Sequence, residues 1–195
     1  MKKINILIAL FCALLFVVSC SNTSKRNNSK NIEIVETNTM SVDSLLSGVN
    51  ALNGKEVIVE GVCTHICAHG GRKIFLMGSD DTKTIRIEAT EAIGKFKQDC
   101  VNSLVMVKGK LVEDRIDEEY LVSWEKQVAI QEVEQHGEDK EAGCSTEKKA
   151  RGEIGNTVKD RITNFRKRIA DRQKKEGKNY LSFYHIDGEN YEIIN

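Results

Sequence analysis

The pattern of apolar and polar residues predicts several strands in the first two thirds of the chain. Short segments rich in β-branched residues, separated by turn-forming residues, are typical of strands that pack one face on a core. A helix is predicted over 91–102, where Ile93, Phe96 and Val101 give a rough apolar face. The predicted strands are Val57–Val62, Lys73–Met77, Thr84–Glu88, Leu104–Val112 and Tyr120–Trp124.

Helical spacing marks the segments on both sides of these strands. Ser41 can cap a short helix whose apolar residues recur at helical intervals up to the stop signal Asn53-Gly54. After Trp124 the pattern becomes helical and highly charged, and a long helix is predicted over 146–176. The last segment, 180–194, alternates around Asp187-Gly188 and predicts a terminal hairpin.

Three strands, a helix and two further strands, with Gly61 inside a long first strand, are typical of the OB-fold, a five-stranded partly open barrel. We therefore expect a mainly β protein with appended helices. Its barrel domain would span 41–126 and include a short N-terminal helix. Residues 127–195 would form a helical extension with the terminal hairpin.

Residues 1–19 predict a secretory signal peptide, because Lys2 and Lys3 precede a continuous apolar run from Ile4 to Val18. The run is shorter than the roughly 20 apolar residues of a comfortable membrane span. Its end, Val17-Val18-Ser19-Cys20, resembles the lipobox of bacterial lipoproteins, which implies that Cys20 is lipid-modified and becomes the first residue of the mature chain. Residues 20–40, rich in Ser, Asn, Thr and Lys, are expected to form a flexible tether.

The same resemblance places the protein in the bacterial cell envelope, bound to a membrane through its lipid. Ser21 stands where an aspartate is associated with inner-membrane retention, which favours the outer membrane. The chain has 29 basic and 29 acidic residues, so its net charge gives no argument for nucleic-acid binding. An exported chain meets oxidising conditions, in which cysteines can form disulfides as well as bind metals.

Cysteine and histidine alternate in Cys63-Thr64-His65-Ile66-Cys67-Ala68-His69, the densest group of soft ligands in the sequence. On an extended strand Cys63, His65, Cys67 and His69 would share one face, with neighbours roughly 6.5–7 Å apart. Zinc holds its ligands at about 2.0–2.3 Å, so this row can give two or three ligands to one ion. A further ligand would come from water or from Cys100, His136, Cys144 or His185.

The direction of this face depends on Gly61. Without a bulge the row would face the core, where the cysteines would be small buried hydrophobes. A bulge at Gly61 would turn Val62, Thr64 and Ile66 inward and expose the cysteine and histidine face. A metal site, redox-active or disulfide-forming cysteines, and purely structural residues all remain open from the sequence.

Other candidates are weaker. Cys144 lies just ahead of a helix start, where a thiol pKa would fall, although a plain capping loop is the commoner explanation. The basic face of the long helix is explained by solvation and acid–base pairs. Phe75 is the only aromatic residue on the second and third strands, so no nucleic-acid partner is expected. No nucleophile, base and orienter set can be assigned, which favours a non-enzymatic role.

Taken with the lipobox, Gly61 to Gly71 and Ser182-Phe183-Tyr184-His185 resemble a group of uncharacterised bacterial lipoproteins with an OB-like domain and a CTHxCxHGG motif. That resemblance implies no activity. A looser similarity is to the OB-fold haem chaperones of cytochrome maturation. Their His-x-x-x-Tyr attachment pattern is missing after His185, so haem is not expected.

The sequence therefore favours an envelope lipoprotein that binds zinc or copper through Cys63, His65, Cys67 and His69, with Cys100, Cys144 or His185 as a further ligand or thiol. The alternative is an interaction module that binds an envelope protein or a glycan and has structural cysteines. A thiol redox protein is the third hypothesis.

Overall fold

The computed structural model describes residues 38–68, 70–134 and 144–194. All of them belong to one compact unit, Val35–Asn195. The signal peptide, Cys20, most of the tether, His69 and His136 lie outside the described residues, so the predictions made for them stay predictions. No helix within the described ranges is long and apolar enough to cross a membrane.

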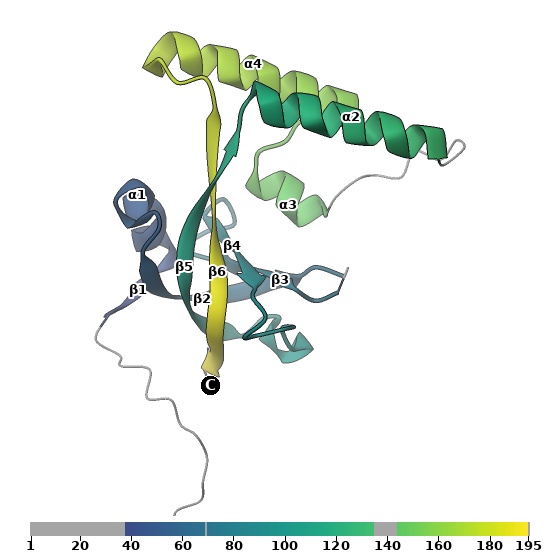
Figure 1. Cartoon of the computed structure of the whole chain (residues 1–195). Coiled ribbons are helices and arrows are strands. Elements are labelled where there is room, and N and C mark those ends of the chain that lie inside the picture. The colour runs from purple at the N-terminus through teal and green to yellow at the C-terminus, as the bar shows by residue number, and fades with distance from the viewer. Residues whose placement is uncertain (1–37, 69, 135–143, 195) are drawn as a thin grey trace, which may run out of the picture. The chain divides into compact units, whose positions relative to one another are not determined.

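Five strands close a mixed β-barrel (Figure 1). Strand β2 pairs antiparallel with both β3 and β5, β3 pairs with β4, and β6 pairs parallel with β4 and antiparallel with β5. A short extra strand, β1 (Thr39–Ser41), lies parallel to β2 at the edge. The mainly β barrel with appended helices is thereby confirmed. The barrel strands are β2 (Glu56–Ile66), β3 (Lys73–Met77), β4 (Thr84–Ala89), β5 (Leu104–Ile116) and β6 (Leu181–Ile194).

The fifth barrel strand was assigned wrongly from the sequence. Residues 120–124 lie in helix α2 (Glu118–Glu134), whose first turn is capped by the Asp117 side chain accepting from the Tyr120 N–H at 2.9 Å. The C-terminal segment is one continuous strand, β6, and not a hairpin. Asp187-Gly188, taken as a turn, lies inside that strand. The barrel therefore takes its closing strand from outside the predicted range 41–126.

Two helix predictions also need correction. Residues 91–102 contain turns at 91–93 and 101–102 and the short 3-10 helix η2 (Gln98–Cys100), and Gly94 has a φ of 69°. The long helix predicted over 146–176 is divided into α3 (Ser145–Ala150) and α4 (Val158–Glu176). Gly152 and Gly155 have φ values of 58° and 125°, which interrupt the helix between them.

Helix α1 (Val42–Leu52) packs against the barrel and is capped by Ser41 as predicted. Val42 and Leu45 are fully buried in the barrel core, together with apolar residues of all five barrel strands. A Cβ on Gly61 would lie 2.8 Å from both Val42 Cγ2 and the Met77 carbonyl oxygen. Gly61 thus permits the close approach of α1 and β3 to β2, and it does not form the bulge considered above.

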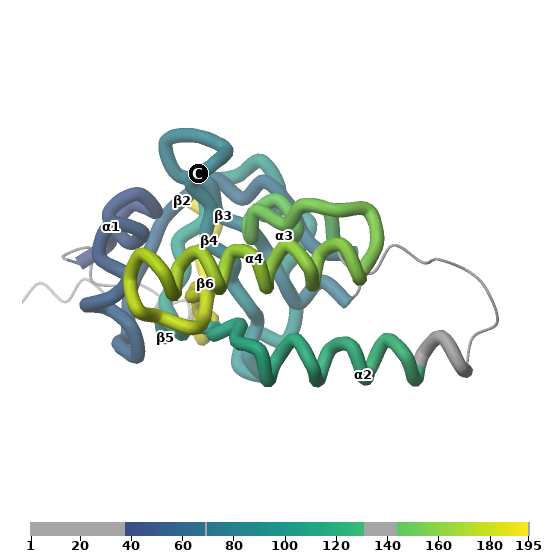
Figure 2. Tube along the Cα trace, turned by 90° about the horizontal axis from the view of Figure 1, so that it is seen from above, coloured from purple at the N-terminus to yellow at the C-terminus, as the bar shows by residue number. Residues whose placement is uncertain are grey.

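A second, smaller core forms beyond the barrel, where β5 and β6 extend toward α2 and α4 (Figure 1). Seen from above, these two helices run side by side (Figure 2), and they contact each other. Leu121, Ile162 and Phe165 are almost completely buried between them. Arg166 links the outer surfaces through ion pairs of 2.7 Å with Glu118 and Glu125.

Candidate metal site

A bulge in β2 divides the predicted cysteine and histidine row. Cys63 pairs with Leu76 and His65 pairs with Phe75, so Thr64 is an extra residue between two consecutive partners on β3. An extra residue reverses the inward and outward alternation of the strand that follows. Cys63 remains in the core with no exposure, and the His65 ring contacts the Phe75 ring at 6.0 Å.

His65, Cys67 and Cys144 form a compact cluster of metal-type donors. Their ligand atoms all lie within 4.8 Å of one another. His65 Nε2 is 3.1 Å from Cys144 Sγ, across 79 positions of sequence. Cys67 is the most buried member, with 7% of its surface exposed. Two of the four residues predicted from the row therefore meet one of the predicted additional ligands.

The backbone around Cys67 holds it at the end of a tight hairpin. Its N–H donates to the Lys73 carbonyl at 2.9 Å, and its carbonyl accepts from the Gly71 N–H at 3.2 Å. Gly70 and Gly71 both have positive φ values, 90° and 64°, which other residues rarely adopt. This turn presents the Cys67 thiol beside His65 rather than farther along a straight strand.

Helix α3 brings Cys144 to the barrel. Cys144 is the residue that caps its N-terminus, and Glu147, one turn later, makes a 2.7 Å ion pair with Arg86 on β4. Lys149 makes a second ion pair, of 2.6 Å, with Asp81 in the loop before β4. The site is thus assembled from two parts of the chain, and ion pairs hold the second part in place.

The two cysteines of the cluster have opposite pKa shifts. Burial, followed by the hydrogen bond with Cys144, raises the pKa of the Cys67 thiol to about 12. Burial also acts to raise the pKa of Cys144, but hydrogen bonds from the backbone of Glu147 and Thr146 and from Cys67 outweigh it, and the pKa is lowered.

This donor set fits a soft or borderline transition metal. Two thiolates and a neutral imidazole match the preferences of zinc and copper, and two thiolates balance the charge of a divalent ion. Ligands bound tetrahedrally at normal zinc distances lie about 3.5–3.8 Å apart. The distances between the donor atoms, 3.1 Å for His65 Nε2 to Cys144 Sγ and at most 4.8 Å for the other pairs, bracket that value, so movements of less than about 1 Å would complete the contacts. Three protein ligands leave one tetrahedral position for water or another ligand.

The other predicted ligands do not join this cluster. Burial raises the pKa of Cys63 to about 11, and it also raises the pKa of the fully buried Cys100. Both are core residues outside the cluster, and the assignment of Cys63 as a ligand stays a prediction. His185 lies between two carboxylates, 2.9 Å from Asp114 and 3.2 Å from Asp187. His69 falls outside the described residues.

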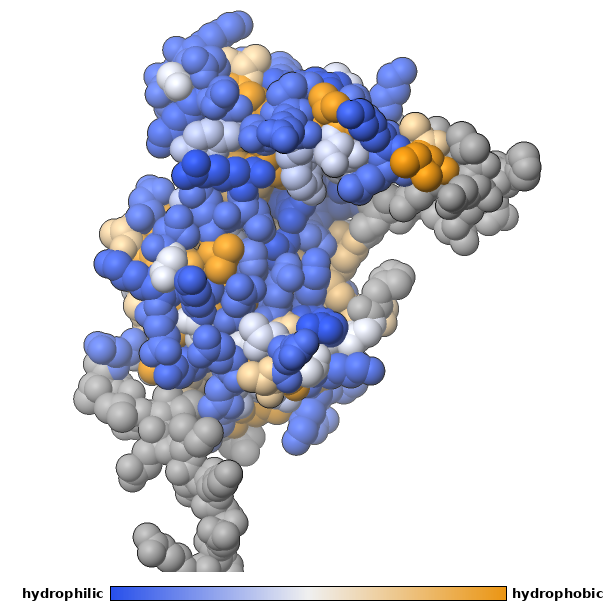
Figure 3. Space-filling view, viewed as in Figure 1, coloured by the Kyte–Doolittle hydropathy of each residue, from blue (hydrophilic) through white to orange (hydrophobic). Residues whose placement is uncertain are grey.

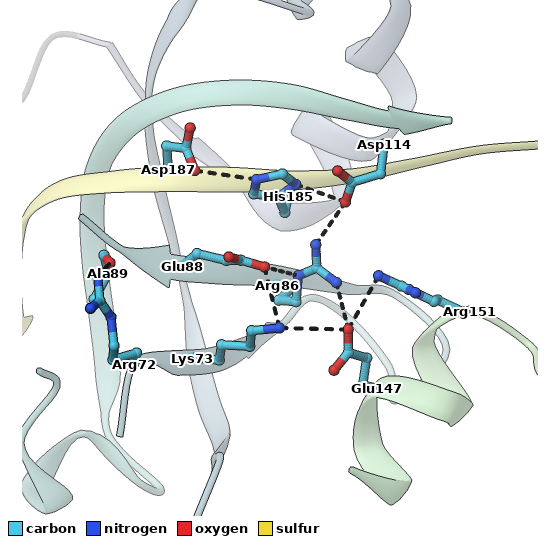
Figure 4. Close-up of polar contacts among 10 residues, drawn as sticks. All are labelled: Arg72, Lys73, Arg86, Glu88, Ala89, Asp114, Glu147, Arg151, His185 and Asp187. Atoms are coloured by element: carbon cyan, nitrogen blue, oxygen red, sulfur yellow. Dashed lines mark hydrogen bonds and ion pairs between the residues drawn. The ribbon is translucent and has the colours of Figure 1, made fainter. Parts of the chain in front are cut away.

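A charged network that no sequence pattern indicated lies beside the site. Arg86 is a charged residue on β4, yet it is only 8% exposed and is covered by α3. It makes ion pairs with Glu88 at 3.0 Å, Asp114 at 2.7 Å and Glu147 at 2.7 Å (Figure 4). The alternation of apolar and polar residues on β4 does not predict this burial, because the helix that covers Arg86 lies far along the chain.

Comparisons with known proteins leave the function open. No protein-family model and no curated protein matches the chain. A putative aspartyl-tRNA synthetase from Leishmania major Friedlin has a TM-score of 0.30 and 14% identity over 50% of this chain and 18% of its own. A DUF3299 family protein from Pseudomonas aeruginosa PAO1 has a TM-score of 0.26 and 16% identity over 36% of this chain and 54% of its own. Similarities this low carry no functional argument.

Proposed function

We propose that this protein is a non-enzymatic, membrane-anchored lipoprotein of the bacterial envelope that binds zinc or copper through His65, Cys67 and Cys144. The observation that carries the metal site is the convergence of three donor atoms within 4.8 Å from segments that are distant in sequence. A cysteine that belonged only to a plain capping loop, the simpler explanation considered for Cys144, would have no reason to lie beside a histidine. Here Cys144 lies 3.1 Å from His65 Nε2.

The chemistry of the cluster favours zinc and copper over calcium and magnesium. Calcium and magnesium prefer oxygen ligands, and the three donors here are two sulfurs and one nitrogen. The acidic side chain one turn into α3, Glu147, is engaged by Arg86 and Arg151 at 2.7 and 3.2 Å. Its charge is therefore already neutralised by arginines, which leaves the sulfurs and the imidazole to hold the metal.

Metal analysis of the purified protein tests the site. We expect about one zinc or copper ion per chain in wild type, and little metal in His65→Ala and Cys144→Ser. Cys100→Ala is the matched control, because it removes a cysteine of the core and should keep the metal. Cobalt added to metal-free protein should give a thiolate-to-cobalt absorption band in wild type and Cys100→Ala only.

The metal proposal fails if folded wild type binds neither zinc nor copper, or if His65→Ala and Cys144→Ser retain as much metal as Cys100→Ala. Circular dichroism would show that each variant is folded before its metal content is compared. Cobalt absorption adds a readout of sulfur ligation that does not depend on the metal acquired during expression.

The lipid anchor rests on the lipobox-like Val17-Val18-Ser19-Cys20. Fractionation of cells that produce the full chain tests it, since wild type should sediment with membranes. Cys20→Ala should lose the lipid and be released, and Cys20-containing peptides should carry the added mass of acyl chains. Equal membrane retention of Cys20→Ala would contradict the anchor.

An interaction module is the weaker alternative for the described part of the chain. The face shown in Figure 3 is mostly hydrophilic, and its hydrophobic residues are scattered between polar ones. Exposed apolar side chains that occur singly are normal on soluble surfaces. Nothing on that face therefore favours docking over the metal site.

A further inference from the structure

The two sulfurs of the candidate metal site are also placed to react with each other. Cys67 and Cys144 are free thiols that hydrogen-bond to one another, and both belong to the cluster whose donor atoms lie within 4.8 Å. We propose that Cys67 and Cys144 form a reversible disulfide, and that this disulfide and a bound metal ion exclude each other. The second half of this proposal rests on the proposed metal site, whereas the first half does not.

The positions of the two cysteines suit closure of the bond. A disulfide requires sulfur atoms about 2.05 Å apart and Cα atoms usually within about 7 Å. Cys67 lies just beyond the end of β2, and Cys144 lies just before the start of α3. Neither sulfur is attached to the interior of a strand or helix, so the remaining approach needs side-chain rotation and small shifts at element ends.

An external disulfide, such as oxidised glutathione or a disulfide-bearing protein, is the oxidant that this chemistry requires. Cys144 is the more exposed of the two residues and is the one that such a molecule can reach. Its thiolate attacks one sulfur of the oxidant, forming a mixed disulfide and releasing one thiolate. Cys67, after losing its proton, then attacks the Cys144 sulfur and releases the second thiolate.

The overall reaction is balanced. The protein loses two protons and two electrons as two thiols become one disulfide, and the oxidant gains them as one disulfide becomes two thiols. No water, metal or other cofactor takes part. Thiols of a reducing partner reverse the reaction by the same steps.

Metal release follows from ligand loss. Thiolates, and not disulfide sulfurs, are the ligands that hold zinc. Oxidation would remove Cys67 and Cys144 from the donor set and leave His65 alone, which is too few ligands to retain the ion. Conversely, a bound ion occupies both sulfurs and blocks their reaction with the oxidant.

The core cysteines provide an internal comparison. Cys63 and Cys100 have no exposed surface, so an external disulfide cannot reach them in the folded protein. Oxidation limited to the cluster would therefore leave these two as thiols. Oxidation that also modifies them would indicate unfolding rather than chemistry at the site.

The experiment uses the full chain, freed of metal with a chelator and incubated with oxidised glutathione. Free thiols are then alkylated, and peptide mass spectrometry identifies each linked pair. We expect a Cys67–Cys144 linkage that dithiothreitol reverses, with Cys63 and Cys100 alkylated. With free zinc at ten times its dissociation constant, only about one molecule in eleven is empty, so linkage should slow about elevenfold.

Two variants separate reaction from mere proximity. Cys67→Ser should stop at a glutathione adduct on Cys144, because the second attacking sulfur is gone. Cys144→Ser should give neither the linkage nor a stable adduct on the buried Cys67. Cys100→Ala should behave as wild type.

The outcomes distinguish the two parts of the proposal. No Cys67–Cys144 linkage in folded, metal-free protein would overturn the disulfide, whatever metal the protein binds. If the protein binds zinc but zinc does not slow formation of the Cys67–Cys144 linkage, the mutual exclusion is overturned. Linkage in a protein that binds no metal would support the disulfide and overturn both the exclusion and the proposed function.

Discussion

His65 Nε2 lies 3.1 Å from the sulfur of Cys144, although 79 positions separate these residues in the sequence. The contact joins the end of β2 to the start of α3. A metal ion placed here would bond to both segments at once. It would therefore connect the helical extension to the barrel. Changes at this site should alter both the affinity for the metal and the free energy of unfolding.

Metal affinity should rise with pH. Burial, with the hydrogen bond to Cys144, raises the pKa of Cys67 to about 12, so its thiol is protonated near neutrality in the metal-free protein. Metal binding must displace that proton, and each proton released makes affinity increase about tenfold per pH unit. Zinc competition with a chelator between about pH 6 and pH 8, corrected for the chelator's own protonation, measures the slope. A flat profile would show that Cys67 does not bind the ion as a thiolate.

Glu147→Gln should weaken metal binding without removing a ligand. Glu147 joins Arg86 to α3 through a 2.7 Å ion pair, and α3 positions Cys144. Loss of one carboxylate also leaves the buried Arg86 with less compensation, so we expect about 1–3 kcal/mol of destabilisation. Chelator competition and urea unfolding measure the two effects.

Lys149→Ala is the matched control on the same helix. The side chains of Lys149 and Asp81, which form an ion pair, are 65% and 69% exposed. Such exposed pairs contribute about 0–1 kcal/mol to stability. It should change affinity and stability little. An equal loss of affinity in both variants would contradict a specific role for the Glu147 contact.

The sequence predicted the fold class because most barrel strands carry local signals. Alternation placed β2 to β5, and Ser41 marked the start of α1. The closing strand β6 was missed because Asp187-Gly188 is typical of a turn. In the structure Gly188 pairs with Ala89 on one side and Gly109 on the other, a close approach of three strands that no local pattern reveals.

The candidate site was predictable only in part, again for physical reasons. The density of cysteine and histidine identified His65 and Cys67, and Cys144 was a candidate because it is one of few remaining thiols. The bulge at Thr64 decides that His65 and Cys67 leave the inward face on which Cys63 lies, but threonine is an ordinary strand residue and gives no bulge signal. Arg86 was missed because its burial depends on α3, which is far away in sequence.

Gly109→Ala should destabilise the barrel at its closure. A Cβ at Gly109 would overlap the Asp187 carbonyl oxygen and lie 2.7 Å from Ile186 Cγ2, so β5 and β6 would have to separate. Forced overlap of this kind costs about 1–3 kcal/mol. Gly48→Ala is the control, since Gly48 lies inside α1 and meets only the flexible end of Leu52 at 3.3 Å. Urea unfolding should show a loss for Gly109→Ala and none for Gly48→Ala.

The stability contributed by His185 should be greatest in mildly acidic solution. Burial acts to lower the pKa of His185, but the hydrogen bond and charge of Asp114 outweigh it and raise the pKa above 6.5. Burial likewise acts to raise the pKa of Asp114, and His185 and Arg86 outweigh it and lower the pKa below 3.8. Glu88 adds to the rise at His185, Arg86 opposes it, and Asp187 lies 3.2 Å from its second nitrogen.

The direction of this pH dependence follows from the protonation states of His185 and Asp114 that the folded protein favours. A raised histidine pKa stabilises the fold below its unfolded value of about 6.5, and this contribution disappears as pH rises through the folded pKa. The depressed pKa of Asp114 stabilises the fold above about 3.8 and loses its effect as pH falls through the folded value. The free energy of unfolding of wild type minus that of His185→Gln should thus be largest between these limits and shrink as pH rises through the raised pKa of His185. Urea unfolding across that range measures it, and a difference that grows with pH above about 6.5 would contradict a protonated His185 paired with Asp114.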